Sequence, residues 1–226
     1  MIEIKNLSKS YEAPGGTVQV LEGLDLVVDT GAAVAVVGPS GSGKTTLLNL
    51  LGCLDRPNSG SIRIANREII GLPPLEVGRY RNRSLGFVFQ QHYLLPQLSV
   101  LENVLVPRLA GGWEETPAET EDRARMLLDK TGLSHRLGHM PWQLSGGEKL
   151  RCAVARALVN QPSLVLADEP TGLLDQSAAE RVADMLIELN HDQGVTMIVV
   201  THNIPLAHRI GRTYELAHGR LREVGT

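Results

Sequence analysis

The 226-residue sequence has few aromatic side chains, only two cysteines and no strong excess of either charge. The formal net charge is −3 with both signs mixed, so charge does not indicate bulk nucleic-acid binding or a polybasic membrane anchor. The cysteines, Cys53 and Cys152, fit a reducing cytosol. A disulfide or a metal role for them is the less favoured interpretation.

Long hydrophobic runs are also missing. The apolar run at residues 32–37 is far too short to span a bilayer, and residues 1–10 contain no apolar core of signal-peptide length. We therefore expect that any membrane crossing is made by another chain. The sequence shows no repeat, low-complexity tract or linker, which predicts one unit spanning residues 1–226.

The most informative stretch is residues 34–46, Val-Ala-Val-Val-Gly-Pro-Ser-Gly-Ser-Gly-Lys-Thr-Thr. An apolar β-branched run leads into Gly-x-x-x-x-Gly-Lys-Thr. Leucines at helical spacing follow, and Gly52 is a natural helix end. This is the phosphate-binding pattern in its required strand–loop–helix order, which makes a chance match in a glycine-containing turn the weaker interpretation.

The residue types of this loop suit a nucleotide phosphate. Glycines let the backbone approach an anion, and the helix N-terminus presents N–H groups to the β-phosphate. Lys44 supplies a charge for the β- and γ-phosphates, and the Thr45 hydroxyl is a hard oxygen ligand suited to Mg²⁺. The predicted nucleotide-binding residues of the loop are Gly38, Pro39, Ser40, Gly41, Ser42, Gly43, Lys44, Thr45 and Thr46.

Polar residues follow three further apolar strands. Residues 164–167 are followed by Asp168 and Glu169, residues 199–201 by His202, and residues 85–89 by Gln90. Because parallel strands deliver their carboxyl ends to one crevice, Asp168 is predicted to hold Mg²⁺ and Glu169 to polarise an attacking water. His202 is placed to contact the γ-phosphate, and Gln90 to reach Mg²⁺ or the water. Each residue also has an interpretation without a catalytic role. The two acids could be solvated loop residues, the histidine could be structural, and a glutamine at a strand end is unremarkable by itself.

A second candidate anion site lies at residues 145–148, Ser-Gly-Gly-Glu, ahead of a helix predicted over residues 148–159. A small hydroxyl, two glycines and a helix N-terminus favour an anion. An ordinary helix cap is the alternative. A second such site in one chain makes sense if Ser145, Gly146 and Gly147 serve the nucleotide of another chain.

The rest of the pattern predicts an α/β fold with a parallel sheet covered on both faces. Capping boxes begin helices at Ser99, ended by Pro107, and at Thr116, ended by Gly132; Gly111 and Gly112 predict a loop between them. Packing is the default interpretation for Trp113 and Trp142. Further predictions are strands at 2–7, 24–28, 61–65, 195–200 and 216–224, a turn at 57–60, and a helix that Gly194 ends.

Taken together, these motifs resemble those of the ATP-binding cassette ATPases. Residues 38–46, Gln90, 144–148, 164–169, 172–175 and His202 look like that family's Walker A, Q-loop, signature, Walker B, D-loop and switch histidine, in the family's order. Tyr11 falls where the family has an aromatic residue that stacks on adenine. The resemblance implies a P-loop NTPase (RecA-like) core at 1–90 and 161–226, with a mostly parallel sheet and an antiparallel β subdomain. It also implies an inserted α-helical subdomain at 91–160.

The same resemblance implies a partner and a cofactor set. Two copies would sandwich two ATP molecules with Mg²⁺, Ser145 and Gly147 of one closing on the γ-phosphate held by Lys44 of the other. Integral membrane permease subunits would bind through about residues 91–106, at the cytoplasmic face of the inner membrane, with no direct nucleic-acid contact. The signature ends in Glu148 where Gln is common, and Leu173 stands where Asn is frequent, which puts coupling across the dimer in question.

Finer resemblances point to the branch of small cassettes that serves lipoprotein release, at residues 52–57, at 85–90 with 94–96, and at 157–160. Macrolide and peptide exporters of the MacB type and the FtsE type of cell-division signalling cassette remain alternatives. A soluble cassette acting on DNA or ribosomes would normally carry a coiled-coil insertion or two cassettes, and a scaffold with feeble hydrolysis would not need Glu169 and His202.

Overall fold

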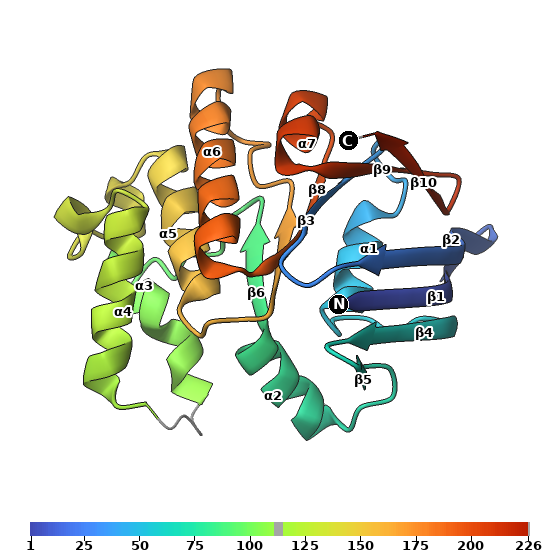
Figure 1. The fold of residues 1–226 in the computed structure, drawn as a ribbon, viewed down its shortest axis with the longest axis horizontal. Coiled ribbons are helices and arrows are strands. Elements are labelled where there is room, and N and C mark those ends of the chain that lie inside the picture. The colour runs from blue at the N-terminus through green and yellow to red at the C-terminus, as the bar shows by residue number, and fades with distance from the viewer. Residues whose placement is uncertain (111–114, 226) are drawn as a thin grey trace.

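Two β-sheets carry the fold of the computed structural model, which describes residues 1–110 and 115–225 (Figure 1). The predicted loop at Gly111–Gly112 and Trp113 lie outside the described residues. Within them, one sheet has six strands and the other has four. This α/β arrangement confirms the predicted fold class.

The six-stranded sheet positions the candidate site. Its strands, in spatial order, are β10 (Arg220–Gly225), β9 (Arg212–Ala217), β3 (Ala33–Val37), β8 (Thr196–Thr201), β7 (Leu164–Asp168) and β6 (Leu85–Phe89). All neighbouring pairs are parallel except β9 and β10. Because Val37 pairs with Thr201, and Asp168 with Val200 and Phe89, the segments that follow these strands leave the same edge.

The four-stranded sheet is antiparallel and consists of β2 (Gly16–Val28), β1 (Ile2–Ala13), β4 (Ser59–Ile64) and β5 (Arg67–Glu68). The turn predicted at 57–60 is wrong in its second half, because β4 already begins at Ser59. Gly60 has a φ of +95°, and a Cβ there would lie 2.5 Å from the Asn6 carbonyl oxygen. Glycine therefore serves close strand packing at this position rather than a reverse turn.

Helices cover both faces of the six-stranded sheet, as the apolar strands predict. On one face, α1 (Lys44–Leu51) packs with Val34 and Val36 and with the four-stranded sheet. On the other face, Ala35 and Val37 pack in a second hydrophobic cluster, which also contains buried side chains of five helices. These are α3 (Val100–Leu105), α4 (Pro117–Lys130), α5 (Gly146–Leu158), α6 (Gln176–Gln193) and α7 (Ile204–Ile210). Short 3₁₀ helices are η1 (Val106–Ala110), η2 (Ser134–Arg136) and η3 (Pro141–Gln143).

Several boundaries differ from the sequence prediction. Helix α2 (Pro74–Ser84) was not expected, because it is polar and packs mainly through Tyr80. The predicted C-terminal strand is a hairpin of β9 and β10. Helix α3 ends at Leu105, just before Pro107 as predicted, and Pro107 itself lies inside η1. Trp142 is 73% exposed, so the packing expectation is wrong. The limits of the helical insert, 91 and 160, stay a prediction.

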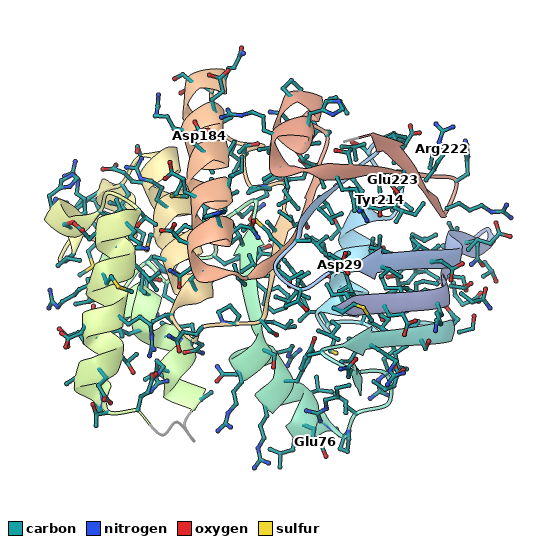
Figure 2. The ribbon with its side chains drawn as sticks, in the orientation of Figure 1. Asp29, Glu76, Asp184, Tyr214, Arg222 and Glu223 are labelled. Atoms are coloured by element: carbon teal, nitrogen blue, oxygen red, sulfur yellow. The ribbon has the colours of Figure 1, made fainter. Side chains whose placement is uncertain are left out.

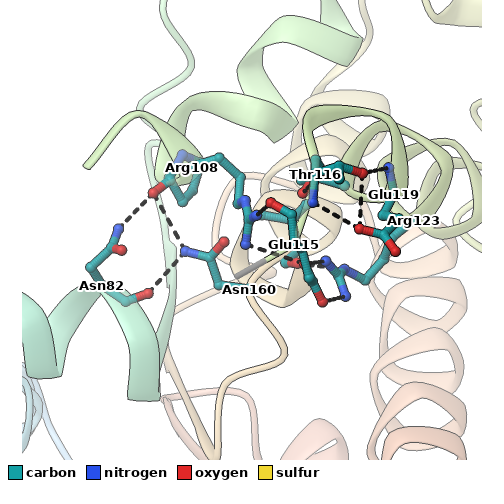
Figure 3. A network of polar contacts seen from close by, with 10 residues as sticks. Asn82, Arg108, Glu115, Thr116, Glu119, Arg123 and Asn160 are labelled. Atoms are coloured by element: carbon teal, nitrogen blue, oxygen red, sulfur yellow. Dashed lines mark hydrogen bonds and ion pairs between the residues drawn. The ribbon is translucent and has the colours of Figure 1, made fainter. Parts of the chain in front are cut away.

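A polar network ties the helical region to α2 (Figure 3). The side-chain amides of Asn82 and Asn160 both donate to the Pro107 carbonyl, at 2.7 and 3.5 Å. Arg123 donates to the Val159 carbonyl at 2.8 Å, and its guanidinium pairs with Glu115. The contacts to the Pro107 and Val159 carbonyls join residues that are 25, 36 and 53 positions apart, so the network links α2, η1, α4 and the end of α5.

Charged side chains of both signs project from the periphery (Figure 2). Many are paired, as Glu76 is with Arg67, Asp184 with Arg209, and Arg222 with Glu215. Exposed pairs of this kind contribute little to stability, so packing of the two hydrophobic clusters is the main stabilising term.

Gly86 in β6 offers a direct test of this packing. A Cβ at Gly86 would lie 2.4 Å from the Ala157 carbonyl oxygen of α5, where helix backbone cannot move away cheaply. We expect Gly86→Ala to lower the free energy of unfolding by about 1–3 kcal/mol, measured by urea denaturation. In the matched control, Gly78→Ala within α2, the new methyl group meets nothing within 4 Å, and a gain of roughly 0.5–1 kcal/mol is expected.

Candidate nucleotide-binding site

The phosphate loop connects β3 to α1, as predicted. Among the described residues, no side chain caps α1 at Gly43, so the first N–H groups of this helix face the loop. The φ angles of Gly41 and Gly43 are +77° and +102°, a region that favours glycine. At Gly38 a Cβ would lie 2.3 Å from the Leu216 carbonyl oxygen, so only glycine fits between the loop and β9.

Lys44 places its ammonium group inside this loop. The side chain is 8% exposed, and Nζ donates to the carbonyls of Gly38 at 2.8 Å and Pro39 at 3.0 Å. Neutral carbonyls hold the charge in place without cancelling it. The loop therefore combines backbone N–H groups and one full positive charge, the chemistry of a phosphate site.

Hard oxygen donors lie directly beside the loop. The Thr45 hydroxyl donates to Oδ1 of Asp168 over 3.3 Å. Burial, reinforced by the negative charge of Glu169, raises the pKa of Asp168 despite the opposing effects of Thr45 and Lys44. A half-buried carboxylate beside a hydroxyl suits a small divalent cation such as Mg²⁺.

Gln90 follows β6 at the same edge. A Cβ at Gly172 would lie 2.8 Å from Nε2 of Gln90, so the amide packs directly against this glycine. The structure therefore brings Gln90 next to the segment that follows Glu169, rather than leaving it in an isolated loop.

Glu169 and His202 form a pair. Oε2 of Glu169 accepts hydrogen bonds from the backbone N–H of His202 at 3.2 Å and lies 2.9 Å from Nδ1 of its ring. The Glu169 side chain is 16% exposed, whereas that of His202 is 66% exposed. Glu169 also has a φ of +45°, which is uncommon for a residue with a side chain. Strained backbone is often found where a side chain must be aimed at a reacting group.

Ser145 caps α5, which begins at Gly146, two residues before the predicted start. Its hydroxyl accepts from the Glu148 N–H at 3.3 Å, and the Glu148 carboxylate accepts from the Ser145 N–H at 2.8 Å. Ser145, Gly146 and Gly147 line a pocket of about 340 Å³ together with Leu173 and neighbouring residues. No phosphate-loop residue lines that pocket, so the two candidate anion sites are separate within one chain.

The capping box at Ser145 makes stability depend on pH. Hydrogen bonds from Ser145, aided by Arg136 and opposed by burial, lower the pKa of Glu148 from 4.5 to about 2. A lowered pKa means that the carboxylate stabilises the fold above pH 4.5 and that this contribution is lost as the pH falls toward 2. We expect Glu148→Gln to lower the unfolding free energy by about 1 kcal/mol at neutral pH, with the difference shrinking below pH 4.5.

Urea unfolding of both proteins across that pH range measures the difference. The control is Glu121→Gln, which removes an exposed carboxylate from its pair with Arg125. Its effect should be small at every pH. A difference at Glu148 that does not change with pH would contradict the assignment.

Tyr11 lies beside the loop, where the Thr46 hydroxyl interacts with its phenol. The residue is 39% exposed, its hydroxyl donates to Oδ2 of Asp55 at 2.7 Å, and Nζ of Lys9 lies 4.6 Å from the ring centroid. Sequence reasoning missed Asp55, because it lies 44 residues away along the chain. It also missed Val18, which pairs with Tyr11 across β1 and β2 and is 52% exposed; strand alternation could have flagged it.

The described residues contain no cluster of three or more His, Cys, Asp or Glu side chains arranged for a metal ion. Any cation at the loop would depend on mixed donors such as Thr45, Gln90 and Asp168. None of the described helices is both long and apolar enough to cross a membrane.

Known proteins are similar to this chain over nearly its whole length. The family model for ABC transporters matches residues 21–172. The lipoprotein-releasing system ATP-binding protein LolD 1 of Rhodopirellula baltica is 48% identical, with 98% of this chain and 96% of that protein covered. LolD of Idiomarina loihiensis is also 48% identical, with 99% and 97% covered, and LolD of Xanthomonas campestris pv. campestris is 49% identical, with 99% and 93% covered.

Solved structures that are similar to this chain belong to the same family. The dimeric structure of MJ0796, a bacterial ABC transporter cassette, superposes with a TM-score of 0.90 at 40% identity, covering 99% of this chain and 98% of that one. A dimeric post-hydrolysis state of MJ0796 bound to ADP and Pi gives 0.90 at 39% identity, with the same coverage. This chain therefore belongs to the ABC transporter family, as an ATP-binding, ATP-hydrolysing cassette.

Proposed function

We propose that this chain is the ATPase subunit of a lipoprotein-releasing transporter, working as a dimer on separate membrane subunits at the cytoplasmic face of the inner membrane. The ATPase assignment is supported above all by one observation: the phosphate loop, Asp168 and the Glu169–His202 pair leave one edge of the sheet. Near-full-length identity of about 48% to LolD proteins supports the cargo class.

ATP binding uses the phosphate loop. The N–H groups at the start of α1 and the Lys44 ammonium bind the β- and γ-phosphates, and the Tyr11 ring stacks on the adenine. Thr45, Asp168 and Gln90 are the residues that would hold Mg²⁺. When bound, this ion neutralises charge on the β- and γ-phosphate oxygens.

Hydrolysis is an in-line attack of water on the γ-phosphorus. Glu169 accepts a hydrogen bond from this water and takes up its proton as the new P–O bond forms. The bond between the γ-phosphorus and the oxygen shared with the β-phosphate breaks in the same step, and ADP leaves with that oxygen. His202, held by its ring and backbone contacts to Oε2 of Glu169, orients the carboxylate and contacts the γ-phosphate.

A second copy completes the site. Ser145 and Gly147 are partly or fully exposed at the start of α5, where they can close on a γ-phosphate presented by another chain. Leu173 is 61% exposed beside them. An apolar side chain at this place in the dimer contact changes coupling between the two sites more readily than it changes the chemistry of either.

The movement that accompanies closing and opening of the dimer is passed to the membrane subunits through residues 91–106. Arg156 of α5 donates to the carbonyls of His92 and Tyr93, both at 2.6 Å, so movement of α5 is passed to the segment that follows Gln90. This segment exposes apolar surface, including Tyr93 at 61%, as expected for a contact with a hydrophobic partner.

Depleting the chain in its host tests the cargo class. Lipoproteins destined for elsewhere should remain in the inner membrane, as seen by membrane fractionation and detection of lipidated proteins. Sensitivity to macrolides without lipoprotein retention would favour the efflux alternative. Blocked division with normal lipoprotein sorting would favour the signalling alternative.

A further inference from the structure

We propose that Lys9 and Asp55 form the rear wall of the adenine site: together they fix the Tyr11 ring so that its exposed face is presented to the base. This inference rests on the proposed function, because it takes Tyr11 as the stacking residue. It adds two residues that act through Tyr11, and therefore affect affinity for the base without touching the phosphates.

Strand geometry places Lys9 and Tyr11 together. They are two residues apart in β1 and so project from the same face. Lys9 is 9% exposed and Tyr11 39%, so Nζ of Lys9, 4.6 Å from the ring centroid, covers the inner side of the ring. The outer side remains open for a planar ligand.

One carboxylate holds both side chains. Oδ1 of Asp55 accepts from Nζ of Lys9 at 2.9 Å, and Oδ2 accepts from the Tyr11 hydroxyl at 2.7 Å. Lys9 also donates to the Arg56 carbonyl at 2.7 Å. With its hydroxyl and one face fixed, the ring has lost most of its rotational freedom before any ligand arrives, which favours binding by preorganisation.

The charges are arranged for recognition more than for stability. Although burial opposes it, hydrogen bonds from Lys9 and Tyr11 lower the pKa of Asp55, so the carboxylate is ionised at neutral pH. A largely buried ion pair contributes little net stability compared with apolar side chains. A cation against one face draws π-electron density toward itself, which makes the other face a better stacking partner for an electron-rich purine.

The position of the Tyr11 ring relative to the phosphate loop also fits an adenine site. Asp55 closely follows α1, and the Thr46 hydroxyl at the start of α1 interacts with the Tyr11 phenol. The ring therefore lies next to the phosphate loop, within reach of a base whose phosphates occupy that loop. Val18, opposite Tyr11 and 52% exposed, gives the base an apolar neighbour.

The test compares two ligands, ATP and inorganic tripolyphosphate, by titration calorimetry in the Glu169→Gln background, so that ATP is not consumed. Lys9→Met and Asp55→Asn should each weaken ATP binding by about 3- to 10-fold and leave tripolyphosphate binding unchanged. Lys9→Arg, which keeps the cation, should restore most of the ATP affinity. The control is Lys5→Met, which removes an exposed lysine paired with Glu3 on the same strand.

The outcomes separate the inference from the proposed function. If Tyr11→Ala weakens ATP but not tripolyphosphate binding, while Lys9→Met and Asp55→Asn change neither, the inference is wrong and the stacking role of Tyr11 stands. An equal loss for both ligands in Lys9→Met would indicate a structural role and overturn the inference. If Tyr11→Ala changes neither ligand, the adenine site and the inference both fail, while the phosphate site remains.

Discussion

Replacing Glu169 with glutamine should lower the rate of ATP hydrolysis by about 10²- to 10⁴-fold and leave ATP affinity nearly unchanged. Glutamine keeps the size of the side chain and can still accept a hydrogen bond from the His202 N–H, but it cannot take a proton from water. Affinity should persist because the proposed phosphate contacts lie in the loop between β3 and α1, which the substitution leaves unchanged. Phosphate release and ATP titration measure the two quantities separately.

A matched control is Glu180→Gln, which removes an exposed carboxylate on α6 that is not part of the proposed site. Its turnover should equal that of the unaltered protein. Normal turnover in Glu169→Gln would show that another group accepts the proton, and the assignment of Glu169 would be wrong.

The second large effect is expected at Ser145, and it concerns assembly. In the Glu169→Gln background, ATP should convert monomers to dimers, and the additional change Ser145→Asp should weaken dimerisation by about 100-fold. Aspartate is as good a helix cap as serine, so α5 should still form. Its negative charge, however, would face the γ-phosphate bound by the other copy.

Light scattering with and without ATP measures the mass, and calorimetry measures ATP bound per chain. The control, Ser145→Asn, is a neutral cap of similar size and should retain far more of the dimer. Dimers of undiminished stability in Ser145→Asp would contradict a γ-phosphate contact in trans. A loss of ATP binding to the single chain would instead place Ser145 in the same site as Lys44.

The sequence was most informative where function depends on local backbone rules. The spacing from Gly38 to Thr45 predicted the loop, and the capping boxes at Ser99 and Thr116 are present in the structure. The parallel sheet brings Asp168, Glu169 and His202 to one edge, as expected from acids and a histidine that directly follow buried strands.

The rest depends on contacts between distant segments, which a single sequence does not report. Lys9 and Asp55 are 46 residues apart, and only the fold shows that they meet at Tyr11. The positive φ of Glu169 was not predicted from the sequence either. Helix α2 has a weak apolar pattern and a glycine at position 78, so tertiary contact through Tyr80 outweighs its modest propensity.

In the proposed function, this ATPase drives membrane subunits that release lipoproteins. The most direct test of this function is to tag the Glu169→Gln protein, solubilise host membranes gently with ATP and Mg²⁺ present, and identify the chains that purify with it. We predict a membrane protein with few spanning helices and a large extracytoplasmic domain. Recovery of nucleic acid or ribosomes without any membrane protein would contradict the transporter assignment, although the ATP site itself would remain.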